Sequence, residues 1–301
     1  MLYTKSKDTE ENIDIYFTRP IGLLWARLFN YFGASPNTVT VVSIFLGVAA
    51  GPCFLHDSWR LAGTEGLLWN IAGILLLMWA NFLDSADGQL ARMTGKTTRV
   101  GRILDGAAEN IWFLSIYHCL IFRLWPEWGW WGAVAFYFCG FVCHASQARM
   151  ADCIRGSYLF FQKGQHQDCL DEQLNLWRTL SWRRQPVEKA LQMFYLNYTF
   201  QQERETPRLQ ELRRYLRDTY GDDIPEDIRR RYLEGTFPLL KWTNFLTFNW
   251  RAFLLYASVL TDCIPLFFWG QVIGFTAVQL YMNHKHERLC HELLSSISGE
   301  R

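Results

Sequence analysis

The chain has 301 residues, of which 50% are hydrophobic and 16% aromatic, including 14 tryptophans and 22 phenylalanines. Only 20% of the residues are charged, and the net charge of +1 gives no basis for binding nucleic acid. So many large apolar side chains are unusual in a soluble protein, and the composition therefore favours an integral membrane protein.

The N-terminal segment is polar and comes before the first long apolar stretch. Residues 1–19 lack the apolar core of a signal peptide. In residues 15–32, apolar side chains alternate with Arg19 and Arg27 at helical spacing, and Pro20 suits a first helical turn. This pattern predicts an amphipathic helix that lies in the membrane interface, or alternatively one that packs on the protein surface.

Six stretches are apolar enough, or nearly so, to cross a bilayer as helices of about 20 residues. They cover residues 39–55, 67–83, 111–125, 130–143, 245–260 and 264–281. The connection between the second and third stretches is basic and contains Arg92, Lys96, Arg99 and Arg102. The connections after the first and third stretches carry one arginine each, Arg60 and Arg123. The positive-inside rule therefore places both termini and the basic connection in the cytoplasm.

Residues 152–242 form a mixed-charge insertion between the fourth and fifth predicted spans, which puts it on the cytoplasmic side. Charge pairs and a Leu/Tyr stripe in residues 206–220 predict short helices. Aromatic residues such as Trp177 and Trp182 need burial, so the insertion is expected to fold.

The sequence therefore predicts an all-α integral membrane fold in three parts. Residues 1–151 hold the interfacial helix and the first four spans, 152–242 the insertion, and 243–301 the last two spans and a cytosolic tail.

Four carboxylates lie at the facing ends of the second and third predicted spans. Asp84 and Asp87 are three residues apart, and Asp105 and Glu109 are four apart, so each pair lies on one helix face. Acids gathered beside the hydrocarbon repel one another unless a cation joins them, and they are candidates for function. Hard oxygen ligands on two facing helices suit Mg²⁺ or Mn²⁺, in a site for one or two ions.

Small and basic residues accompany these acids. Gly88 and Ala91 leave room for a ligand near the helix backbone, and Gly101 interrupts the basic connection. Arg92 is suited to bind a phosphate oxygen or a nucleotide group.

The pattern D-x2-D-G-x2-A-R-x8-G-x3-D-x3-D resembles the signature of the CDP-alcohol phosphotransferases, also called CDP-alcohol phosphatidyltransferases. The chain matches this signature at Asp84, Asp87, Gly88, Ala91, Arg92, Gly101 and Asp105. Glu109 stands where the family has aspartate, and the segment from Asn37 to Thr40 resembles the family's P-N-x-x-T segment. The resemblance covers the six-span membrane domain and not the insertion.

The resemblance implies a homodimer of six-helix subunits with two divalent cations, and transfer of a substituted phosphate group from a CDP-linked donor to an alcohol. CMP is released, a phospholipid or related lipid is made, and the active site faces the cytoplasm, at the inner membrane if the source is bacterial. The implied metal ligands are Asp84, Asp87, Asp105 and Glu109, and Glu109 is also the implied base for the acceptor hydroxyl. The implied donor-binding residues are Asn37, Thr40, Gly88, Ala91, Arg92, Thr98 and Gly101.

The class of donor stays open at this point. CDP-diacylglycerol with a polar acceptor is favoured over a CDP-amino alcohol with a lipid acceptor, because Arg149, Arg155 and Arg251 are available to bind a phosphate-bearing acceptor.

Two functions of other classes compete with the enzyme. The extra methylene of Glu109 is the argument for a catalytically silent membrane scaffold of the same fold, whereas the otherwise intact signature favours an enzyme. A transporter would predict inverted repeats or broken helices, and the sequence shows neither.

Overall fold

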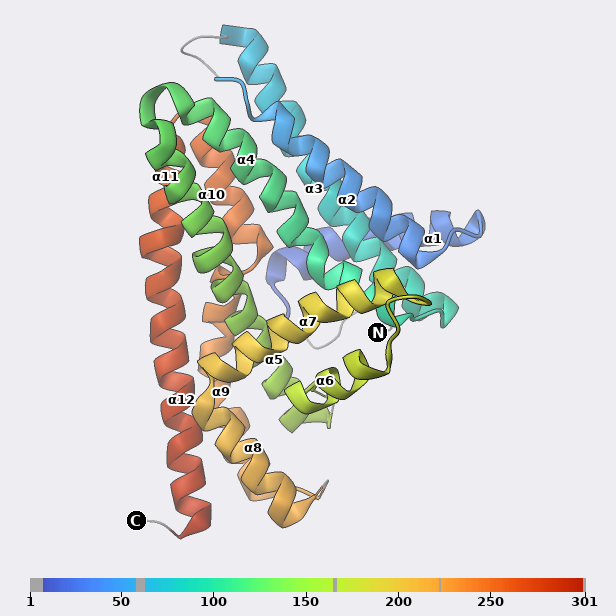
Figure 1. Cartoon of the computed structure of the whole chain (residues 1–301), viewed down its shortest axis with the longest axis vertical. Coiled ribbons are helices and arrows are strands. Elements are labelled where there is room, and N and C mark those ends of the chain that lie inside the picture. Colours follow the sequence, from blue (N-terminus) through green and yellow to red (C-terminus); the bar gives the residue numbers. More distant parts are fainter. Residues whose placement is uncertain (1–7, 58–62, 165–166, 222, 300–301) are drawn as a thin grey trace. The chain divides into compact units, whose positions relative to one another are not determined.

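The computed structural model describes residues 8–57, 63–164, 167–221 and 223–299, and all regular elements in these ranges are helices (Figure 1). The predicted all-α class is therefore confirmed. The chain divides into two compact units. The first comprises Met1–Ala145 and Phe248–Gly274, and the second comprises Ser146–Thr247 and Phe275–Arg301. The predicted division at residues 151 and 242 stays a prediction, and Arg60 of the topology argument lies outside the described residues.

The first unit is built around three long helices that run side by side (Figure 1). Its elements are η1 (Asp14–Thr18), α1 (Arg19–Tyr31), α2 (Pro36–Cys53), α3 (Gly63–Thr94), α4 (Arg99–Tyr137), η2 (Phe138–His144), α10 (Phe248–Leu260), α11 (Ile264–Trp269) and η3 (Gly270–Phe275). The three η segments are π-helical turns. Helix α2 packs on α3 and α4, and α1 packs on α3. Fully buried Trp112, Phe113 and Ile116 of α4 lie in the core of this unit.

The second unit holds α5 (Ala145–Lys163), α6 (Leu170–Thr179), α7 (Pro186–Glu205), α8 (Pro207–Tyr220), α9 (Glu226–Phe245) and α12 (Thr276–Ser298). Its core joins α5, α8, α9 and α12, and the leucine stripe of α8 is buried in it through Leu209, Leu212 and Leu216. Helix α8 thus lies where the charge pairs and the Leu/Tyr stripe predict one.

Side-chain caps fix where two helices of the first unit begin. The Ser35 hydroxyl accepts a hydrogen bond from the Thr38 amide at 3.1 Å, and Pro36 occupies the first turn of α2. The Thr98 hydroxyl accepts from the Gly101 amide at 3.0 Å at the start of α4. Both caps lie in the segments that carry the sequence signature.

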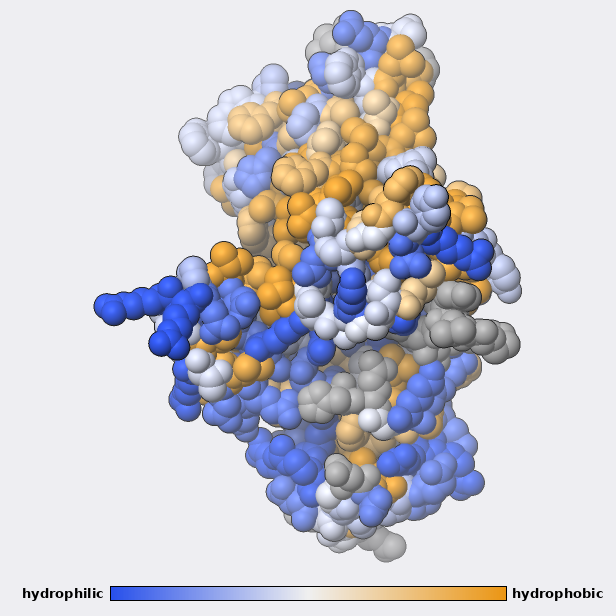
Figure 2. Space-filling model, turned by 90° about the vertical axis from the view of Figure 1, so that its right-hand side faces the viewer, coloured by the Kyte–Doolittle hydropathy of each residue, from blue (hydrophilic) through white to orange (hydrophobic). Residues whose placement is uncertain are grey.

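Three helical stretches in the described residues are long and apolar enough to cross a membrane: Pro36–Cys53, Gly63–Thr94 and Ile264–Ser298. They overlap the first, second and sixth predicted spans. Figure 2 shows hydrophobic side chains gathered over one face of the part of the first unit that contains α2 and α3. Exposed Phe45, Leu75 and Trp79 belong to these two helices, as expected for helices that face lipid. The count of six spans stays a prediction.

A kink at Gly129 divides α4 between the third and fourth predicted spans. Gly129 has φ 49° and ψ −137°, a conformation that glycine adopts without steric cost. Residues 111–125 lie before the kink and residues 130–143 lie after it.

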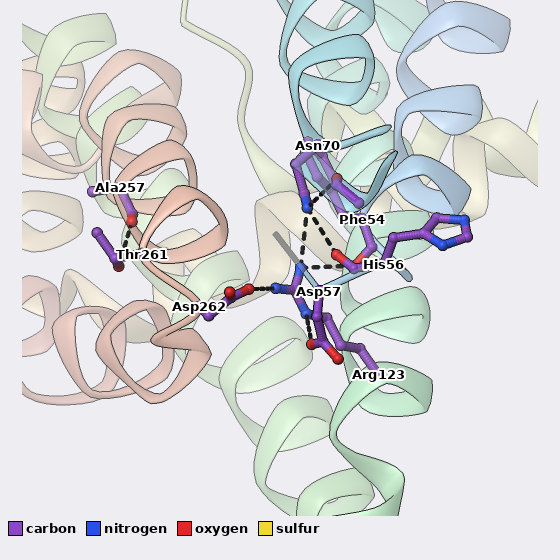
Figure 3. Close-up of polar contacts among 9 residues, drawn as sticks. Phe54, His56, Asp57, Asn70, Arg123, Ala257, Thr261 and Asp262 are labelled. Atoms are coloured by element: carbon purple, nitrogen blue, oxygen red, sulfur yellow. Dashed lines mark hydrogen bonds and ion pairs between the residues drawn. The ribbon is translucent and has the colours of Figure 1, made fainter. Parts of the chain in front are cut away.

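Arg123 of α4 contacts residues of three other segments of the first unit (Figure 3). Asn70 and Arg123 lie many residues along α3 and α4 from the ends that carry the signature. Its side chain is 2% exposed, and Nε lies 3.1 Å from Asp57 Oδ1 while Nη2 lies 2.5 Å from Asp262 Oδ1. Nη1 donates to the Phe54 carbonyl and to Asn70 Oδ1, each at 3.2 Å. This Arg123 cluster therefore ties the end of α2, the start of α3 and the turn after α10 to α4.

Candidate active site

A cavity of about 490 Å³ lies in the first unit where η1, α1, α2, α3 and α4 meet. The end of α3 and the start of α4 supply the signature residues, and the start of α2 supplies Asn37 and Thr40. The predicted donor-binding residues all line this cavity: Asn37, Thr40, Gly88, Ala91, Arg92, Thr98 and Gly101. The structure thus gathers one set of residues that the sequence spreads over about sixty positions.

Three of the predicted metal ligands converge on this cavity. Carboxylate oxygens of Asp84, Asp87 and Asp105 all lie within 4.8 Å of one another. Asp87 is only 3% exposed, and its Oδ2 accepts a hydrogen bond from the Thr40 hydroxyl, which joins α2 to α3. Three hard oxygen donors this close repel one another in the absence of a cation and fit the coordination preference of Mg²⁺ or Mn²⁺.

Two glycines allow the walls of the cavity to form. A Cβ on Gly101 would lie 2.5 Å from Asn37 Oδ1 and 2.9 Å from Thr98 Oγ1, so a larger residue there would displace the Asn37 side chain from the cavity wall. A Cβ on Gly88 would meet only Arg92 Nη1, at 3.6 Å, which leaves open space on that side of α3.

The N-terminal segment contributes residues that the sequence did not assign to the site. Asp14, Thr18 and Arg19 line the cavity. Arg19 pairs with Glu10 at 2.7 Å, and its carbonyl accepts a hydrogen bond from Gln89 Nε2 at 3.0 Å. Gly22 is the one sequence feature that could have indicated this contact of α1 with α3. A Cβ on Gly22 would lie 2.8 Å from Ser85 Oγ, so α1 needs glycine there to approach α3.

Glu109 does not join the three aspartates in the structure. Its Oε1 accepts a hydrogen bond from Arg251 Nη1 at 2.9 Å. Glu109 does not line the cavity, and it is not one of the carboxylates that lie within 4.8 Å of one another. The predicted fourth ligand is therefore directed toward α10, one helical turn beyond Asp105.

The arginines predicted to bind an acceptor phosphate all have partners. Arg251 contacts Glu109, and Arg149 Nη2 lies 2.8 Å from Glu205 Oε1. Arg155 donates to Thr243 Oγ1 at 2.9 Å and to Asn244 Oδ1 at 2.5 Å. The last two arginines belong to the second unit, where they hold its own helices together.

Residues 34–152 match the model of the CDP-alcohol phosphatidyltransferase family. This part of the chain is therefore similar to that family. The resemblance predicted from the signature is therefore confirmed for residues 34–152, and these residues contain the three aspartates and all of the donor-site residues. Arg19 and Arg251 lie outside the matched residues.

Two curated relatives of the chain are archaetidylinositol phosphate synthases. The protein from Aeropyrum pernix is 29% identical over 97 residues, which are 32% of this chain and 44% of the relative. The protein from Pyrococcus horikoshii is 35% identical over 86 residues, which are 28% of this chain and 39% of the relative. The chain thus spans less than half the length of the curated relatives that it matches. No solved structure matches the chain.

Proposed function

We propose that this protein transfers a substituted phosphate group from a CDP-linked donor to an alcohol and releases CMP. The observation that carries the proposal is the cavity in which three aspartates lie within 4.8 Å of one another, beside the residues expected to bind the donor. The relatives named as archaetidylinositol phosphate synthases favour a lipid-linked donor, CDP-diacylglycerol or a similar molecule, and a polar acceptor.

We propose that Asp84, Asp87 and Asp105 hold one or two Mg²⁺ or Mn²⁺ ions. Bound there, such ions would neutralise the charge of a diphosphate and would stabilise the attacking and leaving oxygens of phosphoryl transfer. The Thr40 hydroxyl orients the Asp87 carboxylate by donating to one of its oxygens. Thr40 therefore acts through Asp87 as well as lining the donor site.

The remaining steps belong to side chains of the cavity and its surroundings. We propose that Arg92 binds a phosphate oxygen of the donor, because it lines the cavity one turn from Gly88. We propose Glu109 as the base that takes the proton of the acceptor hydroxyl. A bond then forms between the acceptor oxygen and the β-phosphorus, the bond from that phosphorus to CMP breaks, and CMP leaves with the negative charge.

The membrane setting of the site is part of the proposal. The basic residues Arg92, Lys96 and Arg102 line the cavity, and a concentration of positive charge favours the cytoplasmic side. We also propose that the protein forms a homodimer, on the basis of its resemblance to the family.

The experiment that tests the proposed function uses the full chain, purified in detergent with Mn²⁺ or Mg²⁺. CMP release is followed from CDP-diacylglycerol and from CDP-ethanolamine, with inositol phosphate, glycerol phosphate and diacylglycerol as acceptors. We expect metal-dependent release from CDP-diacylglycerol that Asp105→Ala abolishes. Release from CDP-ethanolamine alone would contradict the donor class, and no release from either bound donor would favour the scaffold.

A further inference from the structure

A set of polar side chains is buried behind the cavity, in the apolar core of the first unit. It consists of Glu109 and Tyr117 of α4, His144 of η2, Arg251 of α10 and Gln271 of η3. Arg251 and Gln271 are 0% exposed, His144 2% and Tyr117 4%, whereas the Glu109 side chain is 28% exposed. Glu109 is therefore the most exposed member of this Arg251 network.

The contacts of the network run in sequence from one side chain to the next. Arg251 Nη1 donates to Glu109 Oε1 at 2.9 Å, and Arg251 Nε donates to Gln271 Oε1 at 3.2 Å. The Tyr117 hydroxyl donates to the same Gln271 oxygen at 2.9 Å and shares a hydrogen bond of 3.1 Å with His144 Nδ1. His144 Nε2 lies 3.6 Å from Glu109 Oε1, beyond the length of a hydrogen bond.

Arg251 is fully buried among apolar side chains and therefore needs a charged partner. A guanidinium removed from water needs a carboxylate and further acceptors to offset its lost hydration. The Phe113 ring lies 5.7 Å from the Arg251 guanidinium carbon and 5.0 Å from the His144 ring centre. Arg251 therefore fixes the position of the carboxylate that accompanies it.

Two π-helical turns supply members of this network. His144 ends η2, and Gln271 lies in η3. A π-turn rotates the following side chains relative to a regular α-helix, and such turns are frequent at functional sites. The π-helical turns η2 and η3 thus each hold a polar side chain, His144 and Gln271, near Arg251 and Glu109.

The length of the Glu109 side chain matches this arrangement. Aspartate at this position would be shorter by one carbon–carbon bond of about 1.5 Å, so its carboxylate would fall short of the 2.9 Å contact with Arg251. The extra methylene of Glu109 thus lets its carboxylate reach Arg251 of α10.

We propose that Arg251 is a positioning residue that fixes the Glu109 carboxylate one helical turn from Asp105, where it would take the proton of the acceptor hydroxyl, with Tyr117, His144 and Gln271 as its support. This inference rests on the proposed function for the role of Glu109 as base. It also assigns metal binding to the three aspartates without Glu109. A base displaced by about 1 Å loses roughly 10²-fold in rate, which is the size of the effect expected when the pair is disturbed.

The experiment compares Glu109→Asp and Glu109→Gln with Asp105→Ala and with the control Glu127→Asp, a glutamate exposed on the same helix. Mn²⁺ binding to the substrate-free protein is measured by electron paramagnetic resonance, and kcat and KM are measured for the most active donor. We expect Glu109→Asp to lower kcat about 10²-fold with unchanged Mn²⁺ affinity, while Asp105→Ala loses Mn²⁺ and Glu127→Asp changes neither. A loss of Mn²⁺ affinity in the Glu109 variants equal to that of Asp105→Ala would overturn the assignment.

Arg251→Lys and Tyr117→Phe test the support of Glu109 with little loss of packing. We expect both to lower kcat with KM unchanged. In the double variant, the fold-loss of kcat should be smaller than the product of the losses in Glu109→Asp and Arg251→Lys, because the two residues act as one unit. Losses that multiply would contradict the proposal. If the wild type releases no CMP, the proposed function fails. Mn²⁺ affinity and the coupling of the two variants in thermal unfolding then still show whether Glu109 pairs with Arg251 or binds the metal.

Discussion

Gly101 controls how closely two helices of the first unit approach at the donor site. The Cβ of an alanine here would lie 2.5 Å from Asn37 Oδ1 and would displace that side chain from the cavity wall. We expect Gly101→Ala to raise the KM for the CDP-linked donor about tenfold, the cost of roughly one hydrogen bond. The helix itself gains up to about 1 kcal/mol from alanine, so thermal stability should not fall in parallel.

The matched control for Gly101 is Gly106 on the same helix. A Cβ on Gly106 would meet nothing within 4 Å. Steady-state rates against donor concentration should therefore be the same for Gly106→Ala and the wild type. An equal rise of KM in both variants would show that helix propensity, and not the approach of α2 to α4, is responsible.

Residues of the site differ in how far the sequence alone could predict them. The three-residue spacing of Asp84 and Asp87 predicts one helix face without knowledge of the fold, whereas the four-residue spacing of Asp105 and Glu109 does not bring Glu109 to the other carboxylates. The partnership of Glu109 with Arg251 spans 142 positions of the sequence. It depends on which face of α10 packs against α4, and no local pattern encodes that.

At the scale of helices, the Arg123 cluster holds together the ends of elements that are remote from the cavity. Arg123 is paired with Asp57 and Asp262, and its guanidinium also binds a carbonyl and an amide oxygen. Arg123→Gln would leave two carboxylates without their cation. We expect this change to cost about 3–5 kcal/mol of unfolding free energy, as for other buried ion pairs that lose one partner.

Thermal unfolding in detergent measures this cost. The control is Arg288→Gln, because Arg288 and Glu292 form a 2.7 Å pair whose side chains are 65% and 59% exposed. Such an exposed pair contributes about 0–1 kcal/mol. At temperatures where Arg123→Gln is folded, its kcat should equal that of the wild type, because the cluster lies at the opposite ends of α3 and α4 from the aspartates. A melting temperature as high as that of the control would disprove the role of the cluster.

Helix interruptions were partly predictable. The break at Gly129 follows Pro126, and these two residue types are the strongest local signals for a turn. The π-helical turns η2 and η3 carry no comparable signal, because a π-turn is stabilised by the contacts of the side chains that it re-aims. Local sequence therefore carries a signal for the break at Gly129 but none for the register shifts at η2 and η3.

For the whole molecule, composition predicted a membrane protein better than it predicted the number of spans. Three helical stretches reach the length and apolar character of a crossing helix. Helix α10 has only 13 residues and carries Arg251, and α4 carries Arg123 and Glu109. Polar side chains that pair with one another inside the first unit lower the apolar character of the helices that hold them, and so weaken the signal on which span prediction depends.

Metal binding by the three aspartates, as proposed, would make the folding stability of the whole chain depend on metal. Carboxylates within 4.8 Å of one another repel in metal-free protein, and a cation that binds only the folded state stabilises it. At a Mn²⁺ concentration 100 times the dissociation constant, the gain is about 2.7 kcal/mol, and EDTA should remove it.

Asp105→Asn should melt at or above the wild-type temperature in EDTA, because one repelling charge is gone, and should gain far less from Mn²⁺. Asp218→Asn, at a residue whose side chain is 67% exposed, should keep the full gain. An equal Mn²⁺ shift in Asp105→Asn and Asp218→Asn would place the ion away from the aspartates.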